Sequence, residues 1–290
     1  YGDQWFGGTT KNPWNTTQGA SGSSAGSSSG TAAGLYAFSL GTETYGSIVS
    51  PCMRCGTTGL RPTFGRVARS GVMSLCYSLD KLGPICRTVG DTALVLAAIH
   101  GRDAADPSSV SEPFNYDPAR TCEGLRVGWH PSWFAGATHA ERKVLQHLKD
   151  AGCDLVEVDL PALPYSTLLI PLFAEAAASF ESLTRSNRDD DLTWQAPEAW
   201  PNTFRKSWFI PAVELVQADR VRRQVMNGMA DIFDSVDALA APSFAANLLL
   251  ITNATGHPAL VQPIAVEGGQ PHGFTLIGRL FDEGTICRLG

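Results

Sequence analysis

The sequence is short of the features that mark several large classes of protein. Its 22 Lys and Arg residues are outnumbered by 28 Asp and Glu, and the net charge of −6 disfavours a protein that binds nucleic acid directly. No apolar run approaches the roughly 18 residues that a membrane-spanning helix needs. Seven cysteines are an odd number in a long chain, which favours free thiols over a disulfide scaffold. We therefore expect a cytoplasmic protein with no membrane span and no direct nucleic-acid partner.

Motifs that hold metals or phosphates are also scarce. No Gly-Lys pair occurs anywhere, which excludes a Walker phosphate loop. Cys52 and Cys55 have the spacing of half a zinc site, but no second pair of ligands follows at a suitable distance, so packed free thiols are favoured. The histidines form no metal-binding array, and His257 falls in a predicted turn where a structural role is favoured. The sequence predicts neither a metal site nor a cofactor.

The hydrophobic pattern predicts an α/β protein. Apolar residues recur at helical spacing over residues 91–100, 141–151 and 214–233. Short apolar runs predict strands at residues 125–129, 155–158, 238–241, 259–266 and 274–277. The chain begins at Tyr1 rather than Met, and both ends resemble the interior of a domain, so we expect a fragment in which a missing signal peptide is uninformative.

Residues 19–34 are almost entirely Gly, Ser, Ala and Thr, and two interpretations of this tract stay open. Composition alone favours a flexible linker, and residues 1–19 before it are expected to form a loop. Against a linker, the tract lacks charge and proline, and a second small-residue tract follows closely at residues 42–47. Two such loops around a short apolar stretch suggest that they meet at a site, because small residues allow close backbone approach and inward-facing N–H groups.

A nucleophilic serine is the chemistry that the sequence supports best. Two Gly-x-Ser-x-Gly matches centre on Ser24 and Ser28, but composition alone produces such matches here, and no hydrophobic strand precedes them. Ser47 is better placed, because it follows Gly46 in a tight loop after the apolar residues 38–40. A serine there lies beside consecutive backbone N–H groups of the kind that form an oxyanion hole, although the spacing equally fits a helix N-cap.

Further segments continue the pattern around Ser47. They are Gly22-Ser23-Ser24-Ala25-Gly26-Ser27, Ala32 to Leu35, Gly41 to Ile48, Cys55 to Val67 and Ser78 to Pro84. With these segments the chain resembles the amidase signature family of serine hydrolases, closely over residues 9–100. The resemblance implies one α/β amidase domain over residues 1–290, truncated at both ends, with a mixed, twisted sheet core flanked by helices on both faces. It also implies a variable substrate-side region at residues 160–235.

The family uses a Ser–Ser–Lys triad, and the resemblance assigns two of its members. Ser47 matches the nucleophile. Ser23, which lies 24 residues earlier and in the family usually follows a cis peptide bond, matches the serine that relays protons. A serine hydroxyl needs such help because it is a weak nucleophile at its free pKa. The matching oxyanion donors are the backbone N–H groups of Thr44, Tyr45, Gly46 and Ser47, and the matching supporting loop contains Gly22 and Ser24.

The third member of the triad has no counterpart among the five lysines. In the family this lysine lies well upstream of the relaying serine, and only 22 residues precede Ser23 here. Lys11 lies in a polar loop and is expected to be solvated, and Lys81 matches a family position that is not known as the base. The remaining lysines, which also do not fit, are Lys143, Lys149 and Lys206. We therefore expect the catalytic lysine to lie upstream and this fragment alone to be nearly inactive.

Two residues of the nucleophile loop depart from the family pattern. Many members have Gly before the Gly-Ser pair and Arg two residues after the nucleophile, where this chain has Tyr45 and Val49. Tyr45 narrows the loop, and it either faces the acyl pocket or packs outside it. The absence of the Arg weakens any claim to a small, charged substrate.

The resemblance implies an amidase that hydrolyses a carboxamide C–N bond through an acyl-enzyme on Ser47. Its expected partner is a small-molecule amide, and a homodimer is compatible with the sequence. One alternative is the A subunit of the glutamyl-tRNA(Gln) amidotransferase, which shares the signature. The others are a non-catalytic amidase-like binding protein and a module tethered by a Gly/Ser linker.

Overall fold

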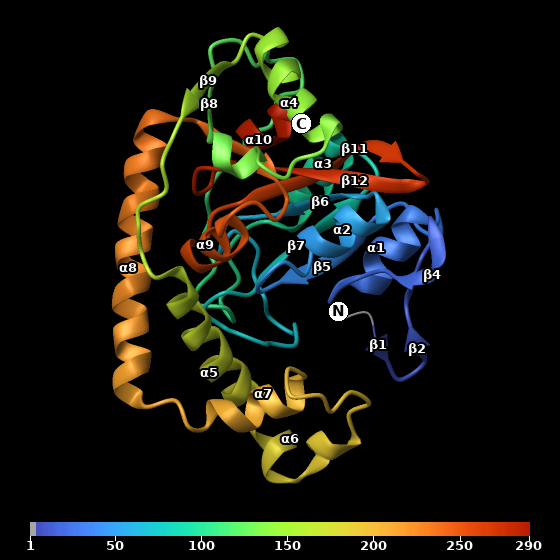
Figure 1. Cartoon of the computed structure of the whole chain (residues 1–290), viewed down its shortest axis with the longest axis vertical. Coiled ribbons are helices and arrows are strands. Elements are labelled where there is room, and N and C mark those ends of the chain that lie inside the picture. Colours follow the sequence, from blue (N-terminus) through green and yellow to red (C-terminus); the bar gives the residue numbers. More distant parts are fainter. Residues whose placement is uncertain (1–3) are drawn as a thin grey trace.

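One mixed β-sheet forms the centre of the protein, of which the computed structural model describes residues 4–290. Residues 1–3 of the expected N-terminal loop lie outside the described part. Within it, eight strands follow the order β5-β7-β6-β11-β12-β10-β8-β9 (Figure 1). In this order they span Ser39–Glu43, Lys81–Cys86, Thr58–Arg61, Ala259–Glu267, Gln270–Gly278, Ala238–Pro242, Arg126–Trp129 and Asp154–Glu157. β8 pairs in parallel with β9 and β10, and the other pairs are antiparallel.

The two longest strands, β11 and β12, join the two halves of the chain. Gly268 and Gly269 both have positive φ at the hairpin turn between them, +58° and +74°, a conformation that tight hairpin turns require. On its other edge β11 pairs with β6, so that Leu260 lies opposite Leu60. The C-terminal hairpin therefore completes the sheet that the N-terminal strands begin.

Helices flank this sheet. They are α1 (Ala25–Ala32), α2 (Val49–Cys55), α3 (Val89–Ile99), α4 (His139–Asp150), α5 (Leu169–Ser179), α6 (Glu181–Arg185), α7 (Trp200–Ser207), α8 (Ala212–Ser235), α9 (Leu248–Thr255) and α10 (Glu283–Leu289), with 3₁₀ turns at Pro131–Phe134, Tyr165–Leu168 and Arg188–Asp191. Every residue of β6 is buried, which requires cover on both faces of the sheet.

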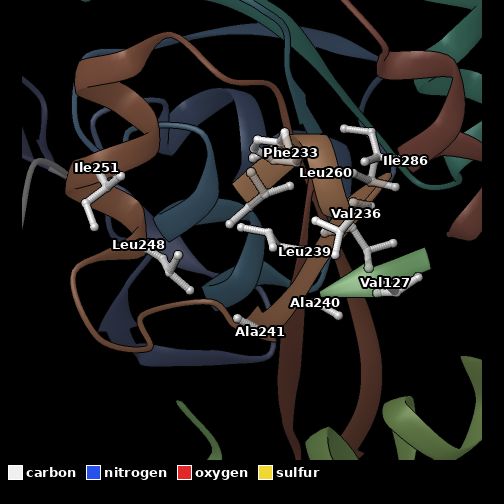
Figure 2. Close-up of a cluster of buried hydrophobic side chains, with 14 of the residues drawn as sticks. Val127, Phe233, Val236, Leu239, Ala240, Ala241, Leu248, Ile251, Leu260 and Ile286 are labelled. Atoms are coloured by element: carbon white, nitrogen blue, oxygen red, sulfur yellow. The ribbon is translucent and has the colours of Figure 1, made fainter. Parts of the chain in front are cut away.

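Figure 2 shows the main core, where strands and helices meet. Val127 of β8, Leu239 of β10 and Leu260 of β11 lie in one buried cluster with Phe233 of α8 and Ile286 of α10. Burying a side chain of this size contributes about 1.5–3 kcal/mol. The α/β class and the flanked mixed sheet are thus confirmed.

The predicted elements are present with small shifts at their ends. The helices expected at residues 91–100, 141–151 and 214–233 are α3, α4 and α8, and the five expected strands are β8, β9, β10, β11 and β12. The prediction of a plain loop over residues 1–19 is wrong for its described part. Two short hairpins form there, β1 (Gln4–Trp5) with β2 (Gly8–Thr9) and β3 (Lys11–Asn12) with β4 (Asn15–Gly19), because the Gly and Asn residues supply the turns.

Residues 160–235, called the arm below, carry α5 to α8. Figure 1 shows α6 and α7 at the end of the molecule away from the sheet, and α8 running back along its side. Hydrophobic residues of α8 such as Val225 and Met229 enter the main core, which anchors the arm to the sheet.

Candidate active site

The two small-residue turns meet at the start of α2. The Gly22–Ser23 peptide bond is cis, and the next residue, Ser24, donates its backbone N–H to the carbonyl of Ser47 at 3.1 Å. The Ser24 hydroxyl also contacts the backbone N–H and carbonyl of Thr42 in edge strand β5, both at 3.1 Å. Gly41 permits this approach, because a Cβ there would lie 2.8 Å from the Ser24 Oγ.

The Gly/Ser tract is packed rather than flexible. Residues 25–32 form α1, in which the Ser27 hydroxyl donates to the Leu40 carbonyl at 2.8 Å. Ser28 is fully buried, with its hydroxyl on the Pro51 carbonyl at 2.9 Å and on the Thr57 hydroxyl at 2.7 Å. The linker interpretation is therefore wrong. Ser24 and Ser28 use their hydroxyls structurally, which also removes them as free nucleophiles.

Ser47 ends its turn without acting as a helix cap. The N-cap position of α2 is Ile48, and the backbone N–H groups of Ile48 and Val49 both donate to the buried Glu43 carboxylate, at 2.8 and 2.9 Å. Ser47 is half-buried and Ser23 is exposed. Within residues 4–290 neither hydroxyl has a hydrogen-bond partner, so Ser23 and Ser47 do not bond each other here, as the proton relay implied by the resemblance would require.

The turn between β5 and Ser47 presents backbone donors. Gly46 has a φ of +93°, which glycine adopts readily and other residues rarely do. The N–H groups of Tyr45, Gly46 and Ser47 make no backbone or side-chain hydrogen bond within the described chain. The Thr44 hydroxyl donates to Asp80 and anchors the start of the turn. Tyr45 is 45% exposed, so its ring stands at the mouth of the turn.

A buried charged network lies under this turn. Arg61 donates to the Glu43 carboxylate at 2.7 Å, and the Asn253 amide donates to the same oxygen at 2.8 Å. Arg61 also donates to Thr252 Oγ1 and to the His257 carbonyl, which ties in α9. Burial raises the pKa of the Glu43 carboxyl, but the Arg61 charge and these hydrogen bonds outweigh it and hold that pKa below its usual value.

Lys81 is buried beside this network. Its ammonium nitrogen donates to the backbone carbonyls of Leu79 and, at 3.3 Å, of Asn253. Within the described residues no carboxylate lies at ion-pair distance from it. Burial, followed by repulsion from Arg61, lowers the pKa of Lys81 to about 7, although the nearby Glu43 and Asp80 charges oppose the shift. Lys11, in contrast, is exposed as predicted.

The sequence did not reveal the roles of Glu43, Arg61, Asp80 and Lys81. All four lie inside the matching segments, but the pattern gave no reason to expect their burial. A usable signal was present, because Glu43, Arg61 and Lys81 lie in or at the ends of strands otherwise made of Gly, Ser, Thr, Pro, Cys and apolar residues, and a charged residue inside such a strand is buried only when it has a partner. That signal points to buried charged residues, but it does not say which of them pair with each other.

Metal chemistry finds no support in the described part of the chain, where no group of three or more His, Cys, Asp or Glu residues could hold an ion. Cys52 and Cys55 are buried free thiols, and burial raises their pKa values to about 12 and about 11. His257 packs on Phe233 with ring centroids 4.9 Å apart and contacts the Thr255 hydroxyl at 2.7 Å. Burial and the Arg61 charge lower the pKa of His257 to about 3, which keeps the ring neutral and structural.

Comparison with known proteins identifies the family of the chain. The family model described as Amidase matches residues 1–254. The chain belongs to the amidase family. It is 33% identical to the A subunit of the glutamyl-tRNA(Gln) amidotransferase of Roseiflexus sp. (strain RS-1) over an alignment of 328 positions, gaps included, which covers 97% of this chain and 67% of that amidase-family relative.

Two solved structures of this family are similar in fold. The A subunit of the glutamyl-tRNA(Gln) amidotransferase from Thermotoga maritima superposes with a TM-score of 0.80 and 26% identity, covering 96% of this chain and 66% of that one. Native peptide amidase from Stenotrophomonas maltophilia gives a TM-score of 0.82 and 27% identity, covering 98% and 67%. The chain thus spans about two thirds of the length of these amidase-family relatives. Throughout residues 4–290, the helices are too short or too polar to span a bilayer.

Proposed function

We propose that the protein hydrolyses the C–N bond of a carboxamide, with Ser47 as the nucleophile and Ser23 as the proton relay. The observation that carries this proposal is the contact between the two turns, in which the Ser24 N–H bonds the Ser47 carbonyl. That contact brings two unpartnered serine hydroxyls and three unpartnered backbone N–H groups into one region. Such a combination suits acyl transfer, which needs a nucleophile, a proton path and donors for an oxyanion.

In the proposed reaction the Ser47 Oγ attacks the amide carbonyl carbon as its proton passes to the Ser23 hydroxyl. The carbonyl oxygen becomes an oxyanion that the turn N–H groups stabilise, and each such donor is worth about 10²–10³-fold in rate. The C–N bond then breaks, the leaving nitrogen takes up a proton through Ser23, and an ester on Ser47 remains. Water adds to that ester and releases the carboxylic acid.

The proton that leaves Ser23 needs a base, and the family resemblance assigns this role to a lysine. None of the five lysines contacts Ser23 in the described structure. Lys81, the buried one, donates to two backbone carbonyls instead. We therefore expect slow turnover by these 290 residues alone, because general base help is worth about 10²–10⁴-fold.

Glutamine is the alternative substrate. The named relatives include amidotransferase A subunits, one of them 33% identical to this chain. A protein of that type would release ammonia from glutamine only with its partner subunits present. A peptide amidase is equally similar in fold, so amide hydrolysis without partners is the simpler proposal.

The test is turnover of a panel of aryl, alkyl and peptide amides, and of glutamine, by the natural gene product that contains this chain. Ser47→Ala should abolish turnover, and Ser23→Ala should lower it by about 10²-fold or more. Ser111→Ala is the matched control, because Ser111 is exposed and lies in a loop far along the chain from both turns. Turnover that survives in Ser47→Ala would overturn the nucleophile assignment.

The role of Tyr45 is tested separately. Its half-exposed ring at the mouth of the turn predicts that Tyr45→Gly widens the range of accepted acyl groups. The measurement is the ratio of kcat/KM for large and small acyl amides. An unchanged ratio would place Tyr45 outside the acyl pocket.

A further inference from the structure

A second set of contacts joins the arm to the segment that precedes Asp80. Glu175 of α5 accepts hydrogen bonds from the Ser78 hydroxyl at 2.6 Å and from the Ser78 backbone N–H at 2.9 Å. The Cys76 thiol donates to the same carboxylate at 3.1 Å. Burial, reinforced by the Glu175 charge, raises the pKa of the Cys76 thiol to about 12, so the thiol remains a donor at neutral pH. One carboxylate thus holds two residues of a single loop.

Helix α8 contacts the same loop from the other side of Ser78. Arg222 donates to the Ser78 carbonyl at 3.1 Å, to its hydroxyl at 3.3 Å and to the Ala254 carbonyl at 2.6 Å. An apolar cluster of Cys76 and Leu79 with Leu172 of α5 adds a third contact. A carboxylate, a guanidinium and an apolar cluster together fix residues 76–79 against the arm.

From this loop the contacts continue to the nucleophile turn. One oxygen of Asp80 accepts from the backbone N–H groups of Leu75 and Cys76, at 2.8 and 2.9 Å. The other oxygen accepts from the Thr44 hydroxyl. Asp80 is 7% exposed, so these bonds are shielded from water. Glu175, Cys76, Asp80 and Thr44 therefore form a continuous line from α5 to the turn that ends at Ser47.

We propose that Glu175 is a positioning residue for amide hydrolysis, which sets the conformation of the 44–47 turn through the 76–80 loop and Thr44. This inference rests on the proposed function, and it gives the arm a part in the rate of the chemical step. The oxyanion donors are backbone groups, so only the conformation of the turn can aim them. The Glu175 carboxylate on α5 is suited to setting the conformation of the turn, because it accepts hydrogen bonds from Cys76 and Ser78 in the loop that leads to Asp80.

The first test needs no catalytic activity and uses the natural gene product that contains this chain. In Glu175→Gln the amide in place of the carboxylate weakens the bonds to Cys76 and Ser78 while keeping the side-chain size. Amide hydrogen exchange in a peptide covering residues 41–50 should accelerate about 3- to 30-fold. This range corresponds to the coupling free energies that are typical of residues in contact. Exchange in the β11–β12 hairpin should be unchanged. Ser78→Ala, which removes the hydroxyl donor to Glu175 but keeps the Ser78 N–H and Cys76 donors, should accelerate exchange in the same peptide to a smaller extent.

Glu181→Gln is the matched control, because Glu181 lies on α6 and its one ion-pair partner among residues 4–290 is the exposed Arg185. It should leave exchange over residues 41–50 at the wild-type rate. Unchanged exchange over residues 41–50 in Glu175→Gln would overturn the proposal, and so would an equal acceleration across the whole sheet, because that result shows global destabilisation.

The second test measures kinetics in the natural gene product. Glu175→Gln should lower kcat about 3- to 30-fold while KM stays within about twofold, the signature of an interaction needed mainly in the transition state. In a Thr44→Val background, where the line is already broken, Glu175→Gln should have no further effect. If Ser47→Ala were inactive but Glu175→Gln had wild-type kcat, this inference alone would fail. Full activity in Ser47→Ala would instead overturn the proposed function.

Discussion

The signature core (residues 9–100) and the arm place their charges differently. Glu43 and Arg61 of the core are fully buried and pair at 2.7 Å, with both side chains 0% exposed. In the arm, Glu181 and Arg185 pair at 2.6 Å on the surface, with side chains 48% and 64% exposed. A buried pair is costly to break because the remaining charge has no water, whereas a surface pair is replaced by solvent. The core is thus held by contacts that tolerate little change.

The hydrophobic residues show the same contrast. The core turns are covered by small residues and by buried hydroxyls such as Ser28. At the outer end of the arm, an aromatic stack joins α7 to the end of α5, and in it Phe204 lies 5.1 Å from Phe180 and 5.5 Å from Trp200. Phe209 nearby is 86% exposed. Packing at this end therefore depends strongly on Phe204, and local opening should begin there.

Breaking the buried ion pair should have the largest effect. Arg61→Met leaves Glu43 unpaired in the interior, and we expect a loss of about 3–5 kcal/mol in the free energy of unfolding. Urea denaturation measures it. The double variant Glu43→Gln/Arg61→Met removes both charges and should recover part of the loss. A single variant within about 1 kcal/mol of wild type would contradict this account of the core.

Removing the centre of the aromatic stack should follow. Phe204 is 3% exposed, and Phe204→Ala should cost about 3 kcal/mol, the lower range for a buried Phe. Hydrogen exchange should accelerate across α6 and α7 and stay unchanged in strand β6 of the core. Phe209→Ala is the control and should change stability by less than about 0.5 kcal/mol, because its ring is already in water. Equal acceleration in core and arm would remove the distinction between the two regions.

Lys81 should make core stability depend on pH. The unfolded lysine is protonated below about 10.5, whereas the folded one loses its proton above about 7. Between these values the unfolded state binds more protons, so stability contributed through Lys81 rises with pH, by at most about 1.4 kcal/mol per pH unit. The Lys81→Met variant has no titrating group at this position, so residue 81 makes no pH-dependent contribution to its stability. The free energy of unfolding of the wild type, measured relative to that of Lys81→Met, should therefore increase by about 2–3 kcal/mol between pH 7.5 and pH 9.5. A constant difference would show that Lys81 stays charged when buried.

The smallest effect should come from the exposed pair in the arm. Arg185→Ala removes the bond to Glu181 and the stacking of its guanidinium over Trp208, 4.5 Å from the ring centroid. We expect a loss below about 1 kcal/mol, because solvent replaces both contacts. Thermal unfolding at low and high salt measures it, and a loss comparable to that of Arg61→Met would show that exposure does not separate the two regions.

The sequence located the two turns of the candidate site but not how they are held. The family resemblance proposed Gly22, Ser23 and Ser47 because its Gly/Ser motifs are local and visible in a single sequence. It did not point to Asp80 and Glu175, because these two carboxylates lie far apart in sequence and hold the same loop only when α5 docks on residues 76–79. The linker interpretation failed for a related reason. Whether the hydroxyl of a serine faces water or bonds the backbone depends on which strand lies beside it. The Ser24 hydroxyl bonds the backbone of Thr42 in edge strand β5.

The amino-acid sequence by itself determined the α/β class, three of the helices, five of the strands and the family, because hydrophobic period, turn residues and short motifs act over a few neighbouring residues. Tertiary structure alone decided the burial of Glu43 beside Arg61, the burial of Lys81 near the same Arg61 and the line of contacts from Glu175 to Thr44. Those features depend on strand register and helix docking. Both are fixed by the summed packing of the whole sheet rather than by any one segment.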